Sequence, residues 1–335
     1  MHFDLNDEQR EIKDTARNLL AERSKPAKVR EHAEARSHDA ELWKGLCELG
    51  WAGIAIPEEH GGQGLGMVEL ATLCEELGYA CAPVPFLSNA LAGLAIEEWG
   101  SDEQRSRWLP GIASGEARGT VALDPDEPAL VADPEGAAVI GIPVGGSPRL
   151  VEPGEAKIEP VELIDATRSF ARVGADGGDE VPAGPAHRGM IALAAELTGV
   201  AQKALDMAVE YARDRQQFGR AIGAYQGVSH RCAEMLYDVE ESRSLTYYAA
   251  WTADAEPESM PLAAHMAKAR ASEAAWAVTT NALQVFGGIG FTWENDLQFW
   301  LKRARVAGEL LGTAGEHRDR VAELAGLGSS EPVPA

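Results

Sequence analysis

The chain has 335 residues and 45% hydrophobic content, enough to bury a full-sized core and more than a single core usually holds. Its 53 acidic and 30 basic residues give a formal net charge of -23, which argues against a protein that binds nucleic acid or anionic membranes. No stretch reaches the roughly 18 uninterrupted apolar residues that span a bilayer, so we expect a cytoplasmic protein without membrane insertion. The four cysteines form no CxxC pair, which favours reduced, buried thiols and no metal site.

The first 117 residues show a helical pattern and form a predicted N-terminal helical domain (1–117). Asn6 is expected to cap the first helix, because apolar residues recur at helical spacing directly after it. Further helices are predicted over residues 40–49, 67–78, 88–99 and 102–114. The segment IAIPEEHGGQGLG contains Pro57 and several glycines, which exclude a helix and indicate an ordered loop.

The composition changes over residues 118–184, where prolines and glycines separate short Val/Ile-rich runs such as AAVIGIPV. This pattern predicts short strands joined by turns, and so a small β domain. Long helical segments return over residues 185–327, at 189–213, 226–253 and 261–286, and predict a helical bundle. Residues 328–335 are expected to form a flexible tail. The order predicts a mainly α fold with a small β domain, rather than alternating βαβ units.

The segment YARDRQQFGRAIGAYQ joins two of these helices. Arg215 stands at the end of the first helix and is followed by Gln217, Phe218 and Gly219. Arginine suits a pyrophosphate, because its guanidinium donates two parallel charge-assisted hydrogen bonds. Read from the residues alone, the segment is more often an ordinary solvated helix end.

The segment QVFGGIGF follows a long apolar helix about sixty residues later. Its paired glycines, Gly287 and Gly288, remove side chains where a backbone must approach another group closely. The plainer interpretation is a helix C-cap with Gly287 in the left-handed conformation. The segment lacks the GxGxxG spacing of a Rossmann site.

Together these segments resemble the acyl-CoA dehydrogenase family, whose C-terminal domain carries an RxQFGxxIxxxQ turn and then a QxxGGxGF turn. The opening FDLNDEQREIKDTARNLL and the segment LGWAGIAIPEEHGGQGLG also look like the first helix and the glycine-rich loop of the family. The resemblance implies an N-terminal helical domain, a short middle β-barrel and a C-terminal four-helix bundle.

The family resemblance also implies a cofactor and a reaction. FAD lies between two subunits in this family, and the two turns of one subunit hold the outer half of the dinucleotide in its neighbour. The reaction removes the α-proton of an acyl-CoA thioester with a carboxylate base while the β-hydrogen leaves as hydride to the flavin, and an electron-transfer flavoprotein then accepts the electrons. Carried over by position, the cofactor-binding residues are Arg215, Gln217, Phe218, Gln284, Gly287, Gly288 and, in the late segment LLGT, Thr313.

The catalytic base is where this chain departs most from the family. The usual base stands in a YEGT-like segment that here reads LLGT and places Leu311 at its position. The other known position, at the start of the first helix of the C-terminal domain, is Gly189, and neither residue ionises. Nearby carboxylates are Glu196, Glu309 and Glu316, each expected to be a solvated helix residue, with Glu309 as the first candidate among them.

The middle domain is also short, and the family's TEPxxGSD-type strand is replaced by VALDPDEPALV. A DATR segment keeps Thr167 and Arg168 of a pattern found in short-barrel members, and Arg168 joins the expected cofactor-binding residues. These departures resemble the shortened subunit of actinobacterial heteromeric (α2β2) acyl-CoA dehydrogenases of sterol and lipid breakdown. In that arrangement a full-length partner subunit supplies the catalytic glutamate.

Three alternatives remain open on the sequence. The chain could be a non-catalytic scaffold or binding subunit, or a self-sufficient homotetrameric dehydrogenase that self-associates and uses a relocated base. It could also be a flavin-dependent relative with another reaction, such as a monooxygenase. The retained Arg215 and Gln284 segments favour flavin binding over the scaffold.

Overall fold

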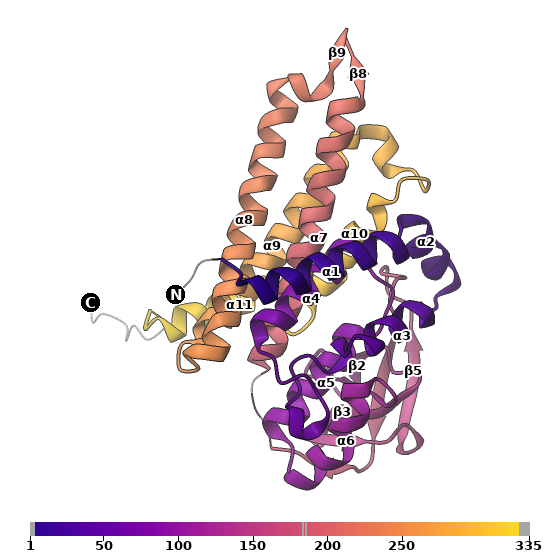
Figure 1. Cartoon of the computed structure of the whole chain (residues 1–335), viewed down its shortest axis with the longest axis vertical. Coiled ribbons are helices and arrows are strands. Elements are labelled where there is room, and N and C mark those ends of the chain that lie inside the picture. Colours follow the sequence, from indigo (N-terminus) through magenta and orange to yellow (C-terminus); the bar gives the residue numbers. More distant parts are fainter. Residues whose placement is uncertain (1–3, 183, 185, 328–335) are drawn as a thin grey trace, which may run out of the picture.

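The computed structural model describes residues 4–182, 184 and 186–327, and the predicted tail 328–335 lies outside them. A helical N-terminal part, a small β region and a bundle of long helices follow one another along the chain (Figure 1). The N-terminal helices are α1 (Asp7–Arg23), α2 (Pro26–Ala35), α3 (Ala40–Glu48), α4 (Met67–Ala80), α5 (Phe86–Trp99) and α6 (Asp102–Ser114). Of these, only α2 has no counterpart among the predicted helices.

Local sequence signals explain where these elements begin and break. The Asn6 side chain accepts a hydrogen bond from the Gln9 backbone N–H at 2.8 Å, and the Gln9 side chain accepts one from the Asn6 N–H at 2.9 Å. This capping box confirms the predicted start of α1. In the glycine-rich loop, a Cβ on Gly62 would lie 2.0 Å from the Ile56 carbonyl oxygen, so no other residue fits there.

The β region consists of two small sheets that share one apolar core. Its strands are β1 (Arg118–Val121), β2 (Ala129–Ala132), β3 (Ala137–Val144), β4 (Ser147–Val151), β5 (Ala156–Val161), β6 (Phe170–Ala175) and β7 (Asp179–Glu180). One sheet has the order β1-β3-β4-β7 and the other β2-β6-β5. Val131, Ile140 and Val173 lie buried between them, and this core holds the short domain together.

The C-terminal bundle contains α7 (His187–Asp214), α8 (Gln226–Ala255), α9 (Met260–Phe286), α10 (Leu297–Glu309) and α11 (Ala314–Leu324). Small residues let its helices approach closely. A Cβ on Gly199 of α7 would lie 1.8 Å from the Glu75 carbonyl oxygen of α4, so the two backbones are in direct contact. The N-terminal domain and the bundle therefore share one core.

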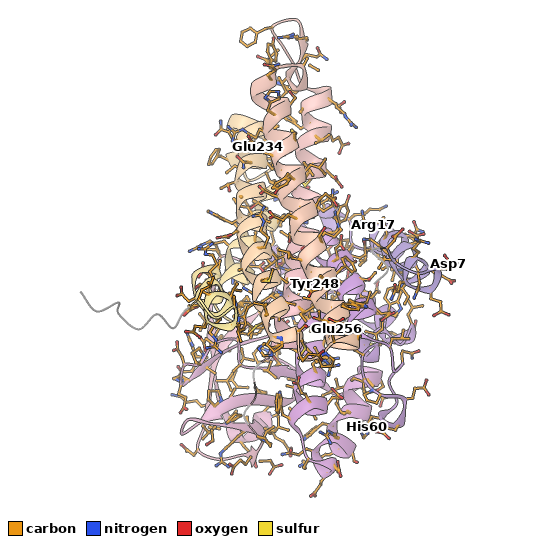
Figure 2. The ribbon with its side chains drawn as sticks, turned by 90° about the vertical axis from the view of Figure 1, so that its left-hand side faces the viewer. Asp7, Arg17, His60, Glu234, Tyr248 and Glu256 are labelled. Atoms are coloured by element: carbon orange, nitrogen blue, oxygen red, sulfur yellow. The ribbon has the colours of Figure 1, made fainter. Side chains whose placement is uncertain are left out.

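The long helices give the bundle two distinct ends. The hairpin of β8 (Gln216–Gln217) and β9 (Arg220–Ala221) projects from one end, and the β region lies at the other (Figure 1). The side view of Figure 2 follows the bundle from Glu234 of α8, nearer the hairpin end, to Glu256, directly after α8. Within the described residues, no helix is both long and apolar enough to cross a membrane.

Candidate functional site

The Arg215 segment forms an exposed turn at the hairpin end of the bundle. Arg215 ends α7, and its carbonyl accepts a hydrogen bond from the Ile222 N–H at 2.9 Å, which closes the hairpin. Phe218 and Gly219 both have positive φ angles, 50° and 81°, as a tight hairpin turn requires. The Phe218 side chain is 93% exposed, and Arg215 has no carboxylate partner within the described chain. The turn is thus ordered while its functional groups face outward.

The Gln284 segment lies at the same end of the bundle. The Phe286 ring at the end of α9 lies 4.6 Å from the Tyr211 ring, one turn before Arg215, so the two turns are held side by side. Gly287 ends α9 with a φ of 64°, and a Cβ on Gly287 or on Gly288 would meet nothing within 4 Å. Gln284 is exposed as well. The backbone of this turn is open to a ligand or to another chain.

These two turns suit the outer half of a dinucleotide. A free guanidinium, an open diglycine backbone and an exposed aromatic ring supply a charge-assisted donor, close approach and a stacking surface. Gln217 contributes less directly, because its side-chain amide donates to the Gln216 carbonyl at 2.7 Å. The residues present therefore fit the outer half of FAD. They lie at the hairpin end of the bundle.

The main cavity lies at the opposite end of α7, between the β region, α5 and α11. It has a volume of about 830 Å³ and contains both family positions for the base, Gly189 and Leu311. Most of its wall is apolar, and residues that form it include Leu91, Leu94, Leu123, Ile142 and Leu150. Both base positions thus line one mainly apolar cavity, and neither brings an ionisable group.

The carboxylates near the two base positions make other contacts. Glu309 pairs with Arg305 at 2.7 Å on the surface of α10 and does not line the cavity. Glu316 does line it, but its carboxylate accepts a hydrogen bond from the Thr313 N–H at 2.7 Å. That contact and the one to the Thr313 hydroxyl lower the pKa of Glu316, which makes it a weaker base.

Glu196 and Arg168 are buried in an ion cluster, so the expectation that Glu196 is a solvated helix residue is wrong. Arg168 pairs with Glu196, and Arg303 of α10 donates to Glu196 at 2.9 Å and to Asp165 at 2.8 Å. Arg303 is fully buried, and Arg168 is 7% exposed. The cluster ties the DATR segment to α7 and α10, so Glu196 acts as a counter-ion. Within this chain the guanidinium of Arg168 is bound to Glu196, and its role in cofactor binding stays a prediction.

The loop between α10 and α11 has a well-defined backbone, although the family position for the catalytic base in it is occupied by Leu311. Leu311 has a φ of 57°, unusual for a residue with a branched side chain, and its N–H donates to the Leu123 carbonyl at 2.9 Å. The buried ammonium group of Lys268 donates to the carbonyls of Gly308 and Gly312 at 3.0 and 3.1 Å. Thr313 caps α11 through its side chain. The backbone around the base position is held in place from both sides.

Sequence reasoning missed a group of buried histidines beside this loop. His265 of α9 and His317 of α11 both line the cavity, and their Nδ1 atoms lie 2.8 Å apart. The His187 ring, at the start of α7, packs edge-on against His265 at 5.5 Å between centroids. Burial lowers the pKa of His265 and the pKa of His317 to about 4, so both are neutral at neutral pH. Single histidines in three separate helices gave no pattern that could have indicated the group.

Comparisons with known proteins agree with this architecture. Residues 6–116 match the profile "Acyl-CoA dehydrogenase, N-terminal domain", and residues 177–325 match "Acyl-CoA dehydrogenase, C-terminal domain". The chain is 34% identical to the acyl-CoA dehydrogenase IpdE2 of Mycobacterium tuberculosis, over 92% of this chain and 95% of that protein. The chain belongs to the acyl-CoA dehydrogenase family. This confirms the resemblance, the mainly α fold with a small β domain, and the expectation of an FAD-dependent oxidoreductase.

Two solved structures extend the comparison. The structure titled "Tcur3481-Tcur3483 steroid ACAD G363A variant" has a TM-score of 0.85 and 29% identity, and covers 96% of this chain and 98% of its own. The ChsE4-ChsE5 complex of Mycobacterium tuberculosis has a TM-score of 0.88 over the whole of both chains, at 24% identity, and this shows a shared fold. Both titles name pairs of proteins.

Proposed function

We propose that this chain is one subunit of a heteromeric, FAD-dependent acyl-CoA dehydrogenase and that a longer partner subunit supplies the catalytic glutamate. The reaction is the α,β-dehydrogenation of an acyl-CoA thioester to a 2,3-enoyl-CoA. The observation that carries the proposal is that Gly189 and Leu311, the two family positions for the base, line one cavity and that neither residue is a carboxylate. A general base must come within hydrogen-bond distance of the proton that it removes, and neither residue can do so.

The positions of the cofactor turns support an assembly. Gly189 stands near one end of α7 and Arg215 directly after the other, and the 26 steps along the chain from one to the other span about 39 Å at 1.5 Å per residue. One dinucleotide cannot bridge that length. The turns of this chain therefore serve a flavin in a neighbouring subunit, with Arg215 on the pyrophosphate and Gln284, Gly287 and Gly288 on the adenosine half. Phe218 closes the side of that site.

The residues of this chain would bind and orient the flavin of the neighbouring subunit. Arg215 contributes a fixed positive charge, and the open backbone of Gly287 and Gly288 allows close approach. The exposed apolar side chains Ile289, Phe291 and Trp293, which follow the glycines, exclude water when a neighbour covers them. The bound flavin would supply the acceptor for the β-hydrogen, as hydride.

The paired names among similar structures support the choice of partner. The titles Tcur3481-Tcur3483 and ChsE4-ChsE5 each name two proteins, and the first is described as a steroid enzyme. By analogy we propose an α2β2 assembly with a longer acyl-CoA dehydrogenase subunit, an acyl-CoA substrate with a sterol-derived or fatty acyl chain, and an electron-transfer flavoprotein as electron acceptor.

The visible absorption spectrum of purified protein tests this function. The chain is purified alone, and together with a co-expressed full-length acyl-CoA dehydrogenase subunit. A yellow, flavin-containing complex and a colourless single chain are expected. A complex without flavin would favour the scaffold instead. Flavin retained by the lone chain, with formation of enoyl-CoA, would show a self-sufficient enzyme with a relocated base.

A further inference from the structure

The two segments that form the hairpin end of the bundle contain no acidic residue, although the chain as a whole is strongly acidic. Acidic residues occupy 53 of 335 positions, yet none occurs in residues 215–233 or 274–293. The first segment carries three arginines, Arg215, Arg220 and Arg231, and the last of these is bound to Asn281 of α9. Segments without carboxylates in a chain with a net charge of -23 are suited to an anionic ligand.

The hairpin places Arg220 beside Arg215 (Figure 1). Gln217 of β8 pairs with Arg220 of β9, and the Arg215 carbonyl accepts a hydrogen bond from the Ile222 N–H at 2.9 Å. Arg215 and Ile222 therefore stand opposite each other, which makes Arg220 the diagonal neighbour of Arg215 on one face of the hairpin. Diagonal neighbours in such a ladder lie about 7–8 Å apart, within reach of one ligand for side chains as long as arginine.

Tyr225, the residue directly before α8, holds the side chain of Arg220 in place. The guanidinium carbon of Arg220 lies 3.9 Å from the centroid of the Tyr225 ring. The hydroxyl of Tyr225 also donates to the Gln217 carbonyl at 3.2 Å, and the Phe218 ring packs edge-on against the same ring. A guanidinium that lies on an aromatic face keeps the N–H groups in its plane available to a ligand.

The charge of Arg220 is not used within the described part of the chain. Its guanidinium forms no ion pair and donates no hydrogen bond to any described residue. This separates it from the other arginines that lie on aromatic rings, each of which is also paired with a carboxylate: Arg17, Arg30, Arg107 and Arg305. Stacking without a carboxylate leaves Arg220 oriented and free to bind an anion.

The pyrophosphate of a dinucleotide carries one negative charge on each of its two phosphates, and Arg215 alone can match only one of them. We propose that Arg220 is a second phosphate-binding arginine, that Arg215 and Arg220 together hold the pyrophosphate of the FAD in the neighbouring subunit, and that Tyr225 is the positioning residue for Arg220. The inference rests on the proposed function, because that function assigns the hairpin to a neighbour's flavin. It adds two positions that the RxQFGxxIxxxQ motif leaves open.

The FAD dissociation constant of the assembled complex tests the role of Arg220. The chain is co-expressed with a full-length acyl-CoA dehydrogenase subunit, and the complex is dialysed to equilibrium against a series of FAD concentrations. Arg220→Ala and Arg220→Gln should each weaken FAD binding about tenfold, as expected for one lost charge-assisted contact. Arg213→Ala, at an exposed position of the same helix end, should stay within about twofold of the unaltered complex.

A double-mutant cycle tests the role of Tyr225. Tyr225→Leu removes the ring and should weaken FAD binding about threefold, whereas Tyr225→Phe keeps the ring and should stay within about twofold. In the Arg220→Ala background, Tyr225→Leu should have no further effect, because Tyr225 acts through Arg220. A merely structural role would weaken FAD binding equally in both backgrounds, and this result would remove the positioning role of Tyr225.

Arg215→Ala in the same dialysis separates this inference from the proposed function. If Arg215→Ala weakens FAD binding while both Arg220 variants match Arg213→Ala, the inference is wrong and the proposed function stands. If Arg215→Ala also matches Arg213→Ala, the hairpin does not hold the flavin, and both are wrong. Thermal unfolding checks the fold of each variant, and because Arg220 is exposed and its two replacements differ in size, either one decides if the other misfolds.

Discussion

A Cβ placed on Gly189 would lie 3.7 Å from Cδ1 of Leu311, so the two positions where the family places its base converge on one point of the cavity wall. They lie 122 residues apart in sequence, at the start of α7 and after α10. The same Cβ would approach Leu91 Cδ2 to 2.8 Å, which shows how tightly apolar groups close this corner. Neither of the two positions offers an acceptor to a proton that leaves a substrate. This geometry supports the proposal that the base comes from another chain.

The carboxylates near the base position should be dispensable for chemistry. We expect Glu309→Gln and Glu316→Gln each to change the turnover of the assembled enzyme by less than about tenfold, well below the 10²–10⁴ expected for a lost general base. Glu309 pairs with Arg305 on the surface, and Glu316 is bound to the first turn of α11. Steady-state kinetics on complexes with equal flavin content measure the effect. A loss of several orders of magnitude in either variant would mean that this chain carries its own base.

The Arg215 turn should hold the flavin of a neighbour. Arg215→Ala should weaken FAD retention by the assembled enzyme, because a charge-assisted contact to the pyrophosphate contributes about 1.5–3 kcal/mol. Arg213→Ala is the matched control, since Arg213 is an exposed arginine of the same helix end outside the family motif. Flavin absorbance after dialysis measures the loss. Equal retention by the two variants would remove the role assigned to Arg215.

Glu196 should matter for stability rather than for catalysis. Glu196→Gln removes the shared counter-ion of two buried arginines, Arg168 and Arg303, and should lower the free energy of unfolding by about 3–5 kcal/mol. Glu210→Gln, on the exposed part of the same helix, should change it by less than about 0.5 kcal/mol. Urea unfolding gives both values. A Glu196→Gln chain as stable as its control would show that the cluster does not hold the domains together.

The order of the domains could be predicted from sequence because it depends on local patterns. The cap at Asn6, the glycine-rich break near Pro57 and the helices from α3 to α9 follow from spacing and turn chemistry. The residue ranges of the three domains stay predictions, although β1 begins at Arg118, directly after the expected boundary. The hairpin at Phe218 was not predicted, because its strands have only two residues each.

The candidate site could be predicted only where family motifs cover it. Motif positions indicated Arg215, Gly287 and both base positions, and their binding roles remain proposals. The pairing of Arg168 with Glu196 and the contact between His265 and His317 depend on which helices meet in three dimensions. No spacing within one segment encodes such contacts. A buried arginine also looks the same in sequence as one that binds a phosphate.

Lys268 should make the stability of the chain depend on pH in the alkaline range. Burial lowers the pKa of this lysine to about 7, from an ordinary value of 10.5, and its ammonium group contacts only neutral oxygens, those of Ser272, Gly308 and Gly312. Because its pKa is lower in the folded chain, the unfolded chain binds more protons between about pH 7 and 10.5. The free energy of unfolding should therefore rise with pH across this window, by up to about 1.4 kcal/mol per pH unit from this group.

Replacing Lys268 by methionine isolates this contribution. Lys268→Met removes the titrating group from a fully buried position, so the slope of stability against pH between pH 7 and 10 should become flatter than in the unaltered chain. The exposed Lys44 serves as the control, because Lys44→Met should leave the slope unchanged. Urea unfolding at pH 7, 8, 9 and 10 supplies the values for all three chains. Equal slopes in the unaltered and Lys268→Met chains would mean that Lys268 keeps an ordinary pKa, and that its charge is stabilised in the interior by contacts other than these oxygens.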